Sequence, residues 1–93
     1  MKSTIDTAIR IVCGRTQEDL AEEAGLGTNT IWRYENGDSV RESTYNKVQA
    51  ALYRFARDYM AENCIGPSEF YARINIVLSE IDECYKWVRP KNY

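Results

Sequence analysis

The segment 15–39 contains two short amphipathic patterns joined by one turn with a glycine in it. Thr16 and Asp19 have the spacing of a capping box at the start of the first pattern, which ends at Gly25. The second pattern ends at Asn36-Gly37, a strong turn signal. Two short helices joined by such a turn can pack at a steep angle, so this segment constrains the fold more than any other.

The second pattern, Thr28–Glu35, has inward and outward faces. Ile31 and Tyr34 are the inward residues, and the outward residues share one side of the helix: Thr28, Asn29, Trp32 and Arg33. Arginine can pair with guanine, asparagine with adenine, and a threonine methyl or an aromatic edge can touch the thymine methyl. A solvated polar face would explain Thr28, Asn29 and Arg33 without a ligand, but it explains Trp32 poorly. The pattern therefore favours a face that reads DNA bases in the major groove.

The rest of the chain predicts three further helices and no strands, so we expect an all-α protein. The first runs from about Thr4 to Cys13, after a capping pattern at Ser3 and Asp6, and the second is a long helix within Val40–Asn63. The break at Gly66-Pro67 separates it from a third. Apolar residues recur at heptad-like spacing on the last two helices: Val48, Leu52, Phe55 and Tyr59, then Phe70, Ile74, Val77, Ile81, Cys84 and Val88. We expect these two helices to fold back as an antiparallel hairpin.

Length and composition exclude several classes of protein. A chain of 93 residues has room for one compact core, which we divide into a DNA-binding region, 1–52, and a C-terminal helical hairpin, 53–93. No apolar run approaches a membrane span, so we expect a soluble, cytoplasmic protein without a membrane partner. The three cysteines are scattered and histidine is absent, so we expect no disulfide framework, metal site or cofactor. We find no nucleophile or acid–base set and predict no enzyme activity.

The motif "TQEDLAEEAGLGTNTIWRYENG", with "IR" at Ile9-Arg10, resembles the Cro/CI-repressor (XRE-like) helix-turn-helix family. The resemblance covers roughly Ile5 to Leu52 and implies a lambda-repressor-like domain that binds double-stranded operator DNA. It implies base reading by Thr28, Asn29, Trp32 and Arg33, and phosphate contacts from Thr16, Gln17, Asn36 and Gly37. It also implies an ion pair between Arg10 and Glu35, where the alternative is two separate surface charges.

Two positions depart from the family pattern. Gly27 stands where a Ser or Thr usually caps the recognition helix, so its first turn is expected to be looser. Trp32 stands at a position that is commonly small or polar, where it could reach a sugar or methyl group, or block a close approach.

The C-terminal helix is rich in aromatic residues, which suits contact with a second subunit. We predict a homodimer whose interface follows the seam of this helix: Phe70, Ile74, Val77, Ile81 and Val88. The alternative is burial of the same seam within one chain. The net charge of −2 means that any DNA affinity comes from local placement of charge. We predict a sequence-specific DNA-binding transcription regulator of the repressor type; the alternative is a protein-interaction module, of the antitoxin or antirepressor type, on the same fold.

Overall fold

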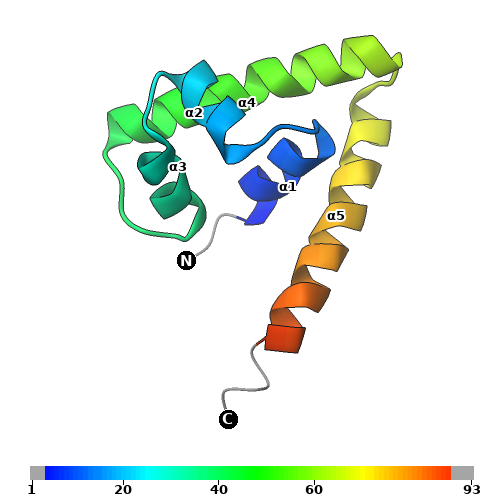
Figure 1. Ribbon diagram of the computed structural model, residues 1–93. Coiled ribbons are helices and arrows are strands. Elements are labelled where there is room, and N and C mark those ends of the chain that lie inside the picture. The colour runs from blue at the N-terminus through cyan, green and yellow to red at the C-terminus, as the bar shows by residue number, and fades with distance from the viewer. Residues whose placement is uncertain (1–3, 89–93) are drawn as a thin grey trace.

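The computed structural model describes residues 4–88, with side chains for residues 5–81, and every element in this range is an α-helix (Figure 1). The helices are α1 (Thr4–Val12), α2 (Gln17–Ala24), α3 (Thr28–Glu35), α4 (Glu42–Asn63) and α5 (Pro67–Val88). The prediction of an all-α fold is confirmed over the described residues. The predicted capping pattern at Ser3 involves a residue outside the described part of the chain.

The ends of α2 follow from the capping chemistry in its sequence. The Thr16 hydroxyl accepts a hydrogen bond from the Asp19 backbone N–H at 3.0 Å, and the Asp19 carboxylate accepts one from the Thr16 N–H at 2.9 Å. Gly25 ends the helix in the left-handed conformation, with φ of 71°, which glycine adopts without steric cost. Both predicted boundaries of α2 are confirmed. At the next helix, Gly27 forms the N-cap without a side-chain hydrogen bond, as its lack of a side chain requires.

The first four helices enclose one apolar core. Its largest completely buried side chains are Leu20 from α2, Ile31 from α3 and Val48 from α4. Helices of eight residues such as α2 and α3 are marginal in isolation, so their stability comes from this packing rather than from intrinsic propensity. The long helix α4 lies against α2 and supplies much of the surface on which the core forms.

The predicted antiparallel hairpin of the last two helices is wrong, because α5 packs against α1. The chain leaves α4 through Cys64, a left-handed residue with φ of 54°, and α5 then runs away from α4 and along α1 (Figure 1). Phe70 and Ile74 of α5 are buried in a second cluster with Ala8 of α1.

The apolar seam of α4 is not available to α5, because it already packs against other helices. Val48, Leu52 and Phe55 already cover the core formed with α2 and α3, and only the end of α4, around Tyr59 and Met60, joins the α5 cluster. The predicted boundary between 52 and 53 falls within α4, and α5 packs on a helix from the N-terminal region. The C-terminal part is therefore not a separate hairpin.

The α1–α5 contact generates a prediction about stability. Ile74→Ala should lower the free energy of unfolding by about 2–5 kcal/mol, because the side chain is only 3% exposed and its removal leaves a cavity. Ile76→Ala, on the same helix at 61% exposure, is the matched control and should change it by less than about 0.5 kcal/mol. Denaturant unfolding followed by circular dichroism would measure both. Equal effects of the two substitutions would contradict the observed packing of α5.

Candidate nucleic-acid interface

The outward side of α3 brings together the four residues that the sequence predicts to read bases. Thr28, Asn29, Trp32 and Arg33 are all exposed, whereas Ile31, Tyr34 and Glu35 on the opposite side are buried. Trp32 is 55% exposed, so it does not pack under another segment of the described chain. An exposed tryptophan beside an arginine and an amide gives this face both hydrogen-bonding and apolar contact groups.

Two of the predicted DNA contacts also have partners within the chain. The Arg33 Nε lies 3.5 Å from the Asp38 carboxylate, with both side chains more than half exposed. The Asn36 side-chain amide donates to the Trp32 carbonyl at 2.8 Å, which also accepts the Asn36 backbone N–H at 3.0 Å. Neither contact was predicted from the sequence, although an asparagine four residues after a helical carbonyl is one signal for the second.

Arg10 of α1 and Glu35 of α3 form an ion pair with two hydrogen bonds. The Arg10 Nε donates to Glu35 Oε2 at 2.7 Å and Nη2 donates to Oε1 at 3.0 Å; the side chains are 13% and 7% exposed. Nη1 donates to the Arg15 carbonyl at 2.9 Å. This planar, two-point geometry uses the fixed fork of the guanidinium and orients α3 against α1.

Gln17, predicted to contact phosphate, also binds Glu35. Its Nε2 donates to Glu35 Oε1 at 3.0 Å, which connects the first residue of α2 to the same carboxylate. This bond was not predicted from the sequence. Neither residue alone signals it, since the contact depends on how the two helices cross. Glu35 therefore accepts hydrogen bonds from both α1 and α2.

A second polar contact positions α3 through the neighbouring residue, Tyr34. The Tyr34 hydroxyl donates to Asp6 of α1 at 2.5 Å and accepts from the Gln49 side-chain amide of α4 at 2.9 Å. Burial raises the pKa of Tyr34, and its hydrogen bond to Asp6 raises the pKa further, so the hydroxyl stays protonated at neutral pH. Burial likewise raises the pKa of Cys13 to about 11, which keeps this thiol protonated and suits a packing role.

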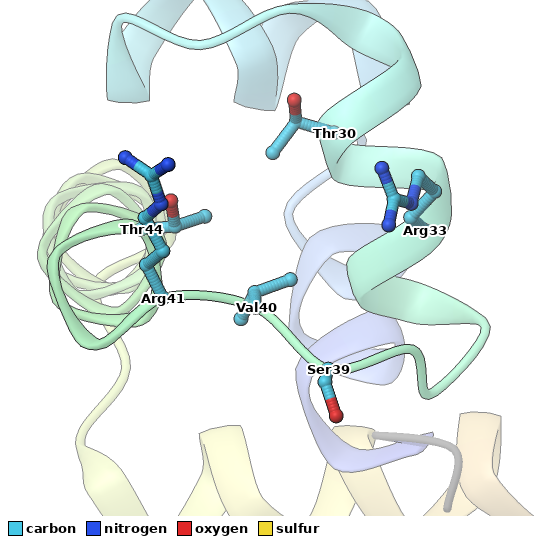
Figure 2. Close-up of a pocket in the computed structure, with 6 residues that line it drawn as sticks. All are labelled: Thr30, Arg33, Ser39, Val40, Arg41 and Thr44. Atoms are coloured by element: carbon cyan, nitrogen blue, oxygen red, sulfur yellow. The ribbon is translucent and has the colours of Figure 1, made fainter.

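A cleft opens beside the outward side of α3, where the chain passes into α4 (Figure 2). Its volume is about 330 Å³, and six residues line it: Thr30, Arg33, Ser39, Val40, Arg41 and Thr44. Of these, only Arg33 was predicted as a site residue from the sequence. The others are scattered over three segments, and only the fold brings them together.

Within the residues that the structure describes, no group of three potential metal ligands converges. Over the same range, none of the helices combines the length and the apolar character that crossing a bilayer requires.

In comparison with protein families, residues 8–52 match the family model described as "Helix-turn-helix". The matched range begins within α1 and ends within α4, so it includes α2, α3 and the turn between them. Comparisons with curated proteins and with solved structures gave no match. Together with the geometry of α3, this match confirms the predicted similarity of residues 8–52 to XRE-like helix-turn-helix regions and agrees with a lambda-repressor-like fold.

The buried ion pair generates a prediction. Each single substitution, Glu35→Gln or Arg10→Met, should lower the free energy of unfolding by about 3–5 kcal/mol, because it leaves a buried charge without its ionic partner. In the double variant the free energy of unfolding should fall by less than the sum of the two single decreases. Denaturant unfolding would measure the cycle, with Arg54 and Glu23 as the control pair.

The control pair is 40% and 37% exposed and should show a coupling energy of only about 0–1 kcal/mol. A coupling energy near zero for Arg10 and Glu35 would contradict the structural role of their ion pair.

Proposed function

We propose that this chain, whose residues 8–52 belong to the XRE-like helix-turn-helix family, is a sequence-specific transcription regulator that acts as a repressor. In this proposal α3 enters the major groove of operator DNA. The observation that carries it is the exposed side of α3, where Trp32 and Arg33 lie beside two small polar residues within the matched range.

The chemistry of this side suits direct reading of base edges. The Arg33 guanidinium can donate two hydrogen bonds to guanine, and the Asn29 amide can pair with adenine. Thr28 and Trp32 can contact thymine methyl groups. For Arg33 to reach a base it must leave Asp38, but an exposed ion pair is worth only about 0–1 kcal/mol. A good bidentate base contact discriminates by about 1–3 kcal/mol, so the exchange favours the DNA complex.

Backbone contacts would hold the domain in register on the duplex. We assign them to Thr16 and Gln17 at the start of α2 and to Asn36 and Gly37 after α3. The bond from Gln17 to Glu35 uses one N–H of its amide, and the second N–H can donate to a phosphate oxygen. Glu35 would thus orient Gln17 toward the DNA backbone as well as holding α3.

Arg33→Ala should lower DNA affinity by about 1–3 kcal/mol and relax the preference at one base pair per half-site. Gln17→Ala should weaken binding to every sequence alike, because a phosphate contact carries no base information. Selection of bound sites from random duplex DNA, followed by affinity measurement, would test both.

The control is Arg57→Ala, which removes an exposed arginine near the end of α4 and should leave base preference unchanged. A uniform loss with Arg33→Ala would make it a phosphate contact instead. If the unchanged chain selects no DNA sequence, the proposal fails and a protein-interaction module becomes the better interpretation.

We also propose that the chain binds DNA as a homodimer, because two half-sites greatly increase the specificity of a single small domain. Phe70 and Ile74, which the sequence analysis placed in the interface, are covered by α1 within one chain. However, α5 has 22 residues, or about 33 Å, whereas α1 has nine, or about 14 Å. The second half of α5 therefore extends beyond α1 (Figure 1), and we assign the interface to it.

Of the other predicted interface residues, Val77 lies at the middle of α5 and Ile81 in its second half; both are partly buried at the edge of the α1–α5 cluster, and the Val88 side chain lies outside the described residues. Ile81→Asp should convert a dimer to a monomer, as measured by sedimentation, while circular dichroism shows retained helix. Ile76→Asp, exposed and on another side of α5, should leave association unchanged. Sedimentation of Ile81→Asp identical to that of the unchanged chain, or its unfolding, would contradict an interface at Ile81.

A further inference from the structure

The cleft beside α3 has the composition of an anion-binding site. Thr30 and Arg33 line it from α3, and Arg41 and Thr44 line it from the start of α4, on the opposite wall (Figure 2). The segment with Val40 joins the two walls. Two arginines and two threonines from two elements thus line one cavity of about 330 Å³, near the lower limit for small-molecule sites.

The charges around the cleft favour an anion with two negative charges. Arg33 and Arg41 contribute two positive charges, and both side chains are exposed at its edge. Arg33 has an acidic partner in Asp38, but this exposed pair is long at 3.5 Å. Glu42 begins α4 but is not among the lining residues. A dianion that contacts both guanidinium groups can therefore displace Asp38 from Arg33.

The start of α4 adds backbone donors to these side chains. Arg41 is the N-cap of this 22-residue helix and makes no side-chain capping hydrogen bond. The N–H groups of a first helical turn have no partner within the helix, and the helix dipole favours negative charge there. An anion between Arg33 and Arg41 would therefore be near these amides as well.

We propose that this cleft binds the phosphate group of a small molecule, either inorganic phosphate or a phosphomonoester, and that this anion competes with DNA for Arg33. The competition rests on the proposed function, whereas the site itself does not. A phosphomonoester carries close to two negative charges at neutral pH and matches both arginines. A phosphate of the DNA backbone has the same oxygen chemistry but a single charge. The experiment must therefore distinguish binding of a small-molecule phosphate from binding of the DNA backbone.

Binding without DNA is tested first, by titration of the full-length chain with inorganic phosphate and observation of backbone amides by NMR. The amides of Arg41 and Thr44 should shift and saturate, whereas sodium chloride at matched ionic strength should not reproduce this. Arg41→Gln should weaken phosphate binding about tenfold, and Arg57→Gln, which removes an exposed arginine from the same helix, should not. Shifts that do not saturate, or that persist unchanged in Arg41→Gln, overturn the site.

Competition is tested next, with DNA selected by the unchanged chain. Phosphate should weaken DNA binding about fivefold more than chloride at the same ionic strength, and Arg41→Gln should abolish this difference. If free phosphate does not bind but Arg41→Gln weakens DNA binding, the cleft serves the DNA backbone and the proposal is overturned. If phosphate binds but leaves DNA affinity unchanged, the competition is overturned. If no DNA is selected, the proposed function fails, and the NMR titration still decides the anion site.

Discussion

The buried carboxylate of Glu35 is the interaction on which the arrangement of the first three helices depends. It accepts two hydrogen bonds from Arg10 of α1 and one from Gln17 of α2, while its own backbone is the last turn of α3. Apolar packing is largely non-directional and would tolerate small rotations of an eight-residue helix. A planar guanidinium and a carboxylate permit few relative orientations, so this pair restricts the rotation of α3 about its own axis.

Tyr34 gives α3 a second directional contact next to the first. Its hydroxyl bonds to Asp6 of α1 and to Gln49 of α4, and its ring fills the core below α3. Two neighbouring residues of the same helix thus connect it to three others. None of the buried side-chain polar atoms in the described chain lacks a hydrogen-bond partner, which is consistent with a polar network that orients α3 without leaving unsatisfied groups.

The parts of the fold that local chemistry encodes could be predicted from the sequence. Thr16, Asp19 and Gly25 define the ends of α2, and helical spacing separates Ile31 and Tyr34 from the outward residues of α3. The position of α5 could not be predicted in this way. Its apolar seam could pack equally well against α4, α1 or another chain. Which of these it contacts depends on the apolar surface that the other helices leave uncovered.

For the same reason the candidate site could be predicted only in part. The outward residues of α3 follow from periodicity, and the Arg10–Glu35 pair was implied by a family resemblance. The bond from Gln17 to Glu35 and the cleft between Arg33 and Arg41 depend on the angles at which helices cross. Those angles result from packing of the whole domain, and no short stretch of sequence contains them.

The attachment of α5 to α1 has a geometric consequence for DNA binding. Ala8 of α1 is completely buried with Phe70 and Ile74 of α5, and two residues later Arg10 holds Glu35. Continuous packing therefore relates the direction of α5 to that of α3, without a flexible linker between them. A dimer formed through α5 would consequently hold its two α3 helices at one separation and one angle. Operators with half-sites about 34–36 Å apart require that kind of rigid spacing, which a hairpin detached from α1 would not provide.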